Sequence, residues 1–195
     1  YQDVSGHRTI YDEVLYARAD ILDMEQKLRN MESEMNKRTG EDLEKLMDIY
    51  HRQSHEFELQ GGYAYRSEVT GILKGLGFSD EDFEKQMNEL SGGQKTRVSL
   101  GKLLVTKPDV LLLDEPTNHL DMESIRWLEN FLRAYKGAVV IVAHDRYFLD
   151  RVVTKVIEIF QHKAYVYQGN YSDFAKKKAK VREDLLKQYY NQQRE

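Results

Sequence analysis

The residues best suited to catalysis or metal binding are two adjacent carboxylates, Asp114 and Glu115, which follow the apolar run VLLL at positions 110–113. A short apolar run bounded by Pro108 and Pro116 is typical of a buried parallel strand. At the carboxyl end of such a strand, Asp114 is suited to hold Mg²⁺, directly or through water. Glu115 is placed to orient or deprotonate a water that attacks a phosphate in line. Strands also end in Asp for turn chemistry alone, so the pair needs support from other motifs.

A glycine-rich turn, Ser91-Gly92-Gly93-Gln94, supplies part of that support. Glycines at the start of a helix let backbone N–H groups approach an anion closely, and the helix dipole favours negative charge there. Ser91 adds a hydroxyl that either contacts the anion or caps the helix. The turn therefore predicts a second phosphate-binding element, ahead of the carboxylates in the chain.

A histidine, His144, follows a second apolar run, AVVIVA, at positions 138–143. A histidine at a strand end can donate a hydrogen bond to a phosphate or polarise the attacking water. A single histidine in such a place is more often structural, and what favours a chemical role is its position in an ordered series. The series is Ser91, Asp114, Glu115, Asp121 and His144.

The elements around these residues predict an α/β fold. Two strand-like runs, at 110–113 and 138–143, enclose residues 122–135, which have helical spacing, and strand–helix–strand order is typical of a parallel sheet. Alternating runs at 156–160 and 164–167 predict a β-hairpin at the edge of that sheet.

Helices are expected on both sides of this region. Short helices are predicted at about 67–76 and 80–89, and from Tyr171 to Glu195 the pattern is helical, without a cap. That last segment is rich in basic residues and contains Lys176, Lys177 and Lys178 in succession.

Residues from about 14 to 60 have the pattern of an antiparallel helical hairpin. The first half carries a coiled-coil seam made of Val14, Ala17, Ile21, Met24, Leu28, Met31 and Met35. Thr39, with Asp42 three residues later, predicts a capping-box start for the returning helix. The stem is acidic overall, and its turn carries two cations, Lys37 and Arg38. These two side chains are either simply solvated or available to contact phosphates.

The motifs resemble those of ATP-binding-cassette (ABC) ATPases. LSGGQ at 90–94 matches their signature, VLLLDEP at 110–116 resembles their Walker B strand, and AHD at 143–145 resembles their histidine switch. Asp121 corresponds to their D-loop. PTNHLD, HDRYFLD and YQGNYSDF further resemble the ABC-F proteins, which are soluble tandem-cassette ATPases that act on ribosomes.

The resemblance implies an α/β fold: the carboxyl-terminal part of an ABC nucleotide-binding domain, with a parallel sheet core and a helical subdomain. An inserted antiparallel α-hairpin arm and a trailing charged helix complete it. The expected parts are an entry segment after the glutamine loop (1–12), the arm (13–62), the helical subdomain with the signature helix (63–107), the core with Walker B and the histidine switch (108–170), and the start of an interdomain linker helix (171–195).

The resemblance also implies roles for individual residues, with ATP and Mg²⁺ as the bound groups. Glu115 and His144 are expected to be catalytic, and Asp114 to hold Mg²⁺. Ser91, Gly92, Gly93, Gln94 and Asp121 are expected to bind nucleotide. Because two cassettes of one chain pair head to tail in this family, the signature turn would face the ATP held by the other cassette.

A phosphate-cradling loop of the form G-x-x-x-x-G-K-[ST] is absent from the sequence. Only Gly101 is followed directly by lysine, and Thr96 and Leu103 occupy the positions where the loop needs glycine and a hydroxyl residue. In the family this loop lies upstream. We therefore expect a piece of a longer protein, cut at both ends and inactive alone, with Gln2 as a candidate remnant of the glutamine loop.

Composition restricts the partners. The net charge of −4 gives no overall attraction to nucleic acid, and no apolar run approaches the length of a membrane span. The chain has no cysteine, which fits a reducing compartment, so we expect a cytoplasmic protein. The ABC-F resemblance implies a ribosome partner, contacted through ribosomal RNA, ribosomal protein or transfer RNA. Candidate phosphate contacts are Lys37, Arg38, Lys176, Lys177 and Lys178.

Two other classes share part of the motif set. The motor subunit of a membrane transporter has the same signature and Walker B, but it does not usually carry a coiled hairpin at this point. A DNA-repair or chromosome-organising ATPase has a carboxyl-terminal lobe that begins with coiled coil, but PTNHLD and GNYSDF do not fit it. Ribosome pelleting against transporter co-purification would separate a ribosome-acting ABC-F protein from a transporter subunit.

Overall fold

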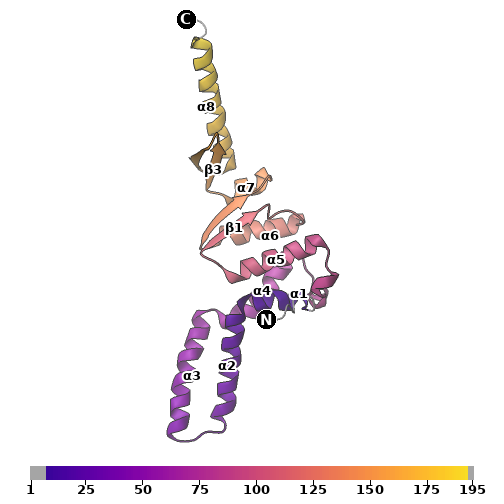
Figure 1. Ribbon diagram of the computed structural model, residues 1–195, viewed down its shortest axis with the longest axis vertical. Helices are drawn as coiled ribbons and strands as arrows, with labels where there is room; N and C mark the ends of the chain where they lie inside the picture. Colours follow the sequence, from indigo (N-terminus) through magenta and orange to yellow (C-terminus); the bar gives the residue numbers. More distant parts are fainter. Residues whose placement is uncertain (1–7, 193–195) are drawn as a thin grey trace.

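The computed structural model describes residues 8–192, and the described part is elongated (Figure 1). A helical hairpin projects from one end and a single long helix from the other. A layer of helices and a small parallel sheet lie between them. The helices are α1 (Ile10–Leu15), α2 (Ala19–Met35), α3 (Glu41–Leu59), α4 (Gly62–Gly75), α5 (Gly92–Thr106), α6 (Met122–Arg133), α7 (Arg146–Val152) and α8 (Tyr171–Gln192). The strands are β1 (Val110–Asp114), β2 (Ala138–Val142), β3 (Lys155–Phe160) and β4 (Lys163–Gln168). Short 3₁₀ turns are η1 (Tyr16–Arg18), η2 (Asp80–Glu84) and η3 (Met87–Glu89).

Strands β1 and β2 form the predicted parallel pair, and α6 connects them. Their residues alternate between the two faces of the sheet, so Leu111 and Leu113 are buried while Val110 and Leu112 are exposed. The predicted buried strand is therefore buried on one face only. Only one face of this sheet packs against the rest of the described chain.

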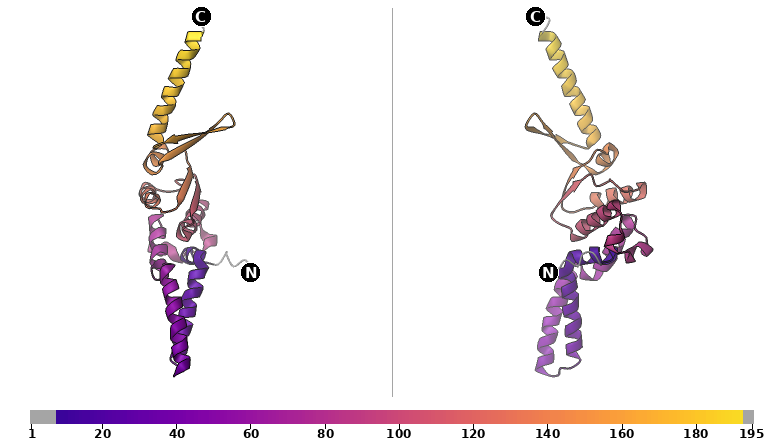
Figure 2. Two further views of the ribbon diagram at one scale, coloured as in Figure 1. Left: turned by 90° about the vertical axis from the view of Figure 1, so that its left-hand side faces the viewer. Right: turned by 45° about the vertical axis from the view of Figure 1, so that its right-hand side comes forward.

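Strands β3 and β4 pair with each other in antiparallel fashion, as the alternating pattern predicted. They form a separate two-stranded sheet and are not hydrogen-bonded to β1 or β2, so the expected place at the edge of the parallel sheet was wrong. Figure 2 shows this β-hairpin extending away from the parallel pair. Ile157 and Ile159 are exposed on it, so little packing fixes it to the sheet.

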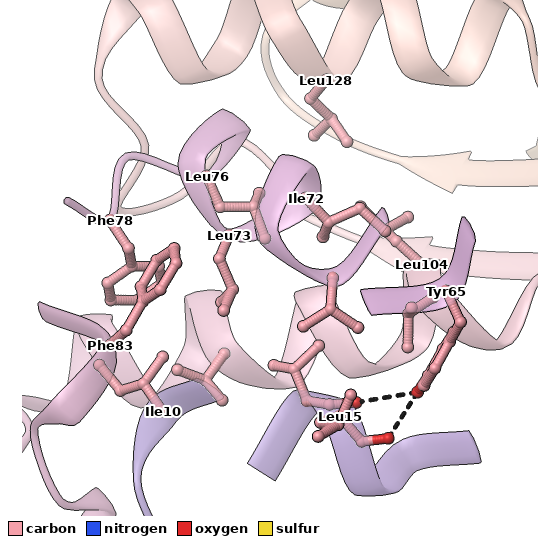
Figure 3. Close-up of a cluster of buried hydrophobic side chains, with 14 of the residues drawn as sticks. Ile10, Leu15, Tyr65, Ile72, Leu73, Leu76, Phe78, Phe83, Leu104 and Leu128 are labelled. Carbon is pink, nitrogen blue, oxygen red and sulfur yellow. Dashed lines mark hydrogen bonds between the residues drawn. The ribbon is translucent and has the colours of Figure 1, made fainter. Parts of the chain in front are cut away.

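The core is centred on the helical layer formed by α1, α4 and α5 (Figure 3). Its fully buried side chains include Ile10, Val14, Val69, Leu73, Leu76, Val98 and Leu104. Val14 was predicted to begin the hairpin seam, which was wrong. It lies in α1, and the 3₁₀ turn η1 redirects the chain before α2 begins.

Polar contacts fasten the base of the hairpin to this layer. The hydroxyl of Tyr65 on α4 donates to the carbonyl of Leu15 at 2.6 Å (Figure 3). The same hydroxyl accepts the backbone N–H of Arg18 at 3.2 Å. The Glu13 side chain on α1 is almost buried and forms an ion pair with the partly exposed Lys102 of α5. The segment that leads into the hairpin is therefore fixed to α4, and α1 is fixed to α5, the helix that begins with the glycine-rich turn.

The hairpin itself is an antiparallel pair of helices, with Ile21 and Leu28 of α2 buried against α3. The predicted capping box at Thr39 was wrong. Helix α3 begins at Glu41 after Gly40, which has φ +65° and makes no side-chain capping bond. This positive-φ conformation is accessible to glycine at no steric cost, and it lies where the chain reverses.

The stretch predicted as a helix at 80–89 is instead two 3₁₀ turns, η2 and η3. Phe78 and Phe83 are buried on either side of Ser79, and Gln86 bridges to Thr9 in a short antiparallel contact. Burial of the two aromatic rings and this bridge hold the backbone in a form that a continuous helix could not adopt. Helix α4 begins at Gly62, earlier than the predicted start at 67.

Helix α8 has a cap, contrary to the prediction. The Asn170 side chain accepts the backbone N–H of Asp173 at 3.0 Å, and the Asp173 carboxylate accepts the Asn170 N–H at 3.3 Å. The Phe174 ring packs on Tyr167 of β4 at 4.9 Å between centroids. The GNYSDF segment thus directs α8 away from the β3–β4 hairpin. Between residues 8 and 192, no helix is long and apolar enough to cross a lipid bilayer.

Candidate functional site

The structure brings Glu115 and His144 together at one edge of the parallel sheet. Glu115 follows β1, and its backbone N–H donates to the carbonyl of Val142 at 2.7 Å. Its Oε2 accepts the backbone N–H of His144 at 3.2 Å, and its Oε1 lies 3.4 Å from Nε2 of the same residue. The Glu115 side chain is 24% exposed and that of His144 is 99% exposed. A carboxylate held in this way is accessible to water and has its orientation fixed by the neighbouring strand end.

Asp114, the last residue of β1, is exposed to solvent. A cavity of about 230 Å³ adjoins both Asp114 and Glu115, so neither carboxylate is sealed in apolar packing. Residues 8–192 contain no cluster of three or more His, Cys, Asp or Glu side chains that could enclose a metal ion. A single open carboxylate fits Mg²⁺, which proteins commonly hold through one or two carboxylates while phosphates and water complete the shell.

The glycine-rich turn begins α5, as predicted. Ser91 is the N-cap: its Oγ accepts the backbone N–H of Gln94 at 3.3 Å, and the Gln94 side chain accepts the Ser91 N–H at 3.0 Å. This capping box leaves the first-turn N–H groups of Gly92 and Gly93 without an intrahelical acceptor. Ser91 and Gly92 are exposed, so an anion can approach them. The predicted capping role of Ser91 is confirmed, and the turn still has donors to offer.

Asp121 caps α6. Its Oδ1 accepts the backbone N–H of Ser124 at 2.8 Å. Hydrogen bonds from Ser124, and then the positive charge of Arg97, hold the pKa of the Asp121 carboxyl below its usual value. The carboxylate is therefore charged at neutral pH and fixed at the start of the helix that follows the site.

Arg97, which the sequence analysis did not identify, links α5 to the end of α4. Its Nη1 donates to the carbonyl of Leu76 at 3.1 Å, and its guanidinium lies 4.7 Å from the centroid of the Phe78 ring. Gly77, with φ +84°, makes room for this contact, because a Cβ there would lie 3.1 Å from Nη1 of Arg97. A basic residue on the signature helix, close after the glycine turn, was the available signal.

His119 was also missed. It lies in the loop between Glu115 and Asp121, has φ +66°, and its exposed ring packs on Gly93. A Cβ added to Gly93 would lie 3.1 Å from Cγ of His119. The loop after β1 therefore touches both the carboxylate site and the glycine turn, which the sequence order alone does not reveal.

The candidate nucleic-acid contacts are less free than their sequence suggested. At the hairpin turn, Arg38 is paired with Glu34 at 2.9 Å. On α8, Lys177 donates to the carbonyl of Gln168 at 2.5 Å, and Lys178 is paired with Glu158. Among the side chains that the structure describes, no ion pair engages Lys37 or Lys176, so these two are the better candidates. Gln2 lies outside the described residues.

Comparisons with known proteins match two separate parts of the chain. Residues 4–118 match a family model described as ABC transporter, and residues 157–195 match a second model with the same description. The chain is 52% identical to YdiF of Bacillus subtilis over 154 residues, covering 79% of this chain and 24% of that protein. It is 39% identical to ABC transporter F family member 2 of Dictyostelium discoideum over 169 residues, covering 87% and 28%.

A third relative is the energy-dependent translational throttle protein EttA of Mycobacterium tuberculosis. It is 43% identical over 136 residues, covering 70% of this chain and 24% of that protein. The chain spans about a quarter of the length of the curated relatives that it matches.

Proposed function

This chain belongs to the ABC-F branch of the ATP-binding-cassette family, and from that premise we propose that the intact protein binds and hydrolyses ATP between two cassettes and acts on the ribosome. The observation that carries the hydrolytic part is the pairing of the Glu115 carboxylate with both the backbone and the ring of His144, at the open end of β1.

In the proposed reaction Glu115 orients the attacking water and accepts its proton. The His144 N–H fixes the direction of that carboxylate, and the exposed imidazole offers a donor toward the phosphate. Asp114 holds Mg²⁺, which neutralises charge on the phosphates when bound. These three residues serve the nucleotide of their own cassette.

The glycine turn serves the other nucleotide. Its free N–H groups at Gly92 and Gly93 stand at the amino end of a 15-residue helix, where the dipole favours an anion. In the proposed head-to-tail pair, they face the triphosphate held by the second cassette. Asp121, fixed by Ser124, lies at the seam between the two nucleotides.

The 195 residues contain no G-x-x-x-x-G-K-[ST] loop. Lysine and the backbone of such a loop supply much of the affinity for phosphates, and no other segment of this sequence replaces it. We expect the 195-residue chain alone to show no tight, stoichiometric binding of Mg·ATP in isothermal titration calorimetry. Tight binding would mean that the nucleotide is held by residues other than those proposed.

Replacement of the proposed base tests the hydrolytic assignment. In the intact protein, Glu115→Gln is expected to slow cleavage of the nucleotide held by this cassette by about 10²- to 10⁴-fold while that ATP stays bound, because the amide keeps the shape of the side chain but cannot accept the proton. Single-turnover kinetics with a nucleotide-retention assay would measure both effects. The matched control is Glu84→Gln, which removes an exposed carboxylate remote from the sheet edge and should leave kcat unchanged. Cleavage of this cassette's nucleotide at the normal rate in Glu115→Gln would refute the assignment.

The ribosome part of the proposal draws on the relative whose name describes a throttle of translation. The two projections of the molecule, the α2–α3 hairpin and α8, extend from opposite ends of the body, which suits contact with a large partner at separate points (Figure 1). We propose that the hairpin is the arm and that α8 begins the linker between cassettes.

A further inference from the structure

We propose that His119 is a positioning residue that seats the glycine turn of α5 against the loop after β1, and so supports turnover of the nucleotide held by the second cassette. This inference rests on the proposed function, because it assigns the Glu115 side and the Gly93 side of the loop to two different nucleotides.

The first observation is the backbone of the loop. Glu115 and His119 are four positions apart, and both adopt left-handed conformations, with φ +47° and +66°. Two tight turns hold them there, from the N–H of Asn118 to the carbonyl of Glu115 at 3.1 Å and from the N–H of Leu120 to the carbonyl of Thr117 at 3.2 Å. This conformation is costly for a residue with a Cβ, and such strain is a reason to look for a function.

The second observation is what the His119 conformation achieves. A Cβ built on Gly93 would lie 3.1, 3.2 and 3.3 Å from Cγ, Nδ1 and Cβ of His119, so the imidazole packs directly on the backbone of the glycine turn. Within residues 8–192, no hydrogen bond or ion pair engages the His119 ring. The interaction that we associate with the strained conformation of His119 is therefore the packing of its ring on Gly93.

The loop is fixed independently at its two ends. At one end, Glu115 contacts His144. At the other, Asp121 caps α6 through Ser124. His119 lies between these anchors and makes the contact with α5, so its ring sets the spacing between the carboxylate site and the glycine turn. Since Ser91 and Gln94 cap α5 by themselves, loss of the ring should displace the turn without unfolding the helix.

The site-selective test uses the intact protein in two backgrounds. With Glu115→Gln, the remaining turnover reports on the nucleotide held by the second cassette. With the equivalent glutamate of the second cassette replaced, it reports on the nucleotide held by this one. We expect His119→Gly to lower turnover on the order of 10- to 100-fold in the first background, through small misplacement of the turn, and to leave turnover within about twofold in the second.

The choice of glycine separates the ring from the backbone. His119→Gly keeps the left-handed conformation at less steric cost, so the variant should fold at least as stably as the parent in thermal unfolding. His119→Asn tolerates the same conformation and retains a shorter planar side chain, so it should restore part of the turnover. Equal losses in both backgrounds, or no loss in either, would overturn the role assigned to His119.

A second variant distinguishes this inference from the proposed function. Ser91→Glu places a carboxylate at the turn expected to receive phosphate, and it should abolish turnover in the Glu115→Gln background. If Ser91→Glu has no effect, the assignment of the turn to the second nucleotide fails, and the role of His119 fails with it. If Ser91→Glu abolishes turnover while His119→Gly does not lower it, the His119 inference alone is wrong.

Discussion

At the scale of single residues, the loop after β1 shows how side-chain type and backbone conformation combine. Glu115 and His119 both depart from the backbone region that ordinary residues prefer, and each directs its side chain to a different neighbour, His144 or Gly93. A sequence displays residue types but not φ angles. For this reason Glu115 and His144 could be predicted as catalytic residues, whereas the contact of His119 with Gly93 could not be predicted.

Asp82 provides a pH-dependent prediction at this scale. Its carboxylate is paired with Lys85 at 2.7 Å and accepts the backbone N–H of Ser79 at 2.8 Å. The pairing with Lys85, followed by the bond from Ser79, lowers the Asp82 pKa from 3.8 to about 2. Because the folded-state pKa is depressed, the stabilisation is present above pH 3.8 and is lost as the pH falls toward 2.

We expect Asp82→Ala to lower the free energy of unfolding by about 1 kcal/mol at pH 7, a modest value because solvent screens a group near the surface. The difference from the parent should shrink between pH 3.8 and 2. Urea denaturation followed by circular dichroism would measure it. Glu81→Ala, the control, removes an exposed neighbouring carboxylate, and the prediction fails if both variants show the same pH dependence.

At the scale of elements, the strongest packing constraint is the crossing of α4 and α6. A Cβ added to Gly75 would lie 2.0 Å from Cε2 of Trp127, so the indole occupies the space above this glycine. Gly71, one turn earlier in α4, has no heavy atom within 4 Å of the equivalent position. The same change at the two positions should therefore have opposite effects.

Gly75→Ala is expected to reduce the free energy of unfolding by about 1–3 kcal/mol, because Trp127 must shift. Gly71→Ala should raise it by about 0.5–1 kcal/mol through better helix propensity. Thermal and chemical unfolding of the two variants would measure the difference. Equal effects would mean that the α4–α6 crossing does not depend on the missing Cβ.

The elements also show where sequence patterns suffice. The β1–β2 parallel pair and the α2–α3 helical hairpin have strong hydrophobic periodicity in the sequence, and both were predicted. Thr39 and Asn170 each precede an acidic residue by three positions, yet only Asn170 forms a reciprocal cap. At the first site Gly40, with its positive φ, takes the N-cap position instead, and nothing local in the sequence shows which of the two outcomes applies.

At the scale of the whole molecule, the free cations test the proposed ribosome contact. Lys37 at the tip of the hairpin and Lys45 on its stem have the same charge, but Lys45 lies 3.6 Å from Glu41. We expect Lys37→Gln to weaken co-sedimentation of the intact protein with ribosomes. The slope of log K for ribosome binding against the logarithm of the salt concentration should become shallower by about 0.7–0.9. Lys45→Gln should change neither. Identical behaviour of the two variants would exclude the tip as a phosphate contact.

The uncovered face of the β1–β2 pair has a practical consequence for anyone who isolates these 195 residues. One exposed hydrophobic patch crosses the two strands. It consists of Val110, Leu112, Val140 and Val142, which are 53, 67, 52 and 60% exposed. Exposed hydrophobic patches of this kind favour self-association, so we expect the molecules to associate through it in concentrated solution. The patch should also bind a fluorescent hydrophobic dye. Detergent or dilution should dissociate the aggregates, and Leu112→Lys should prevent their formation.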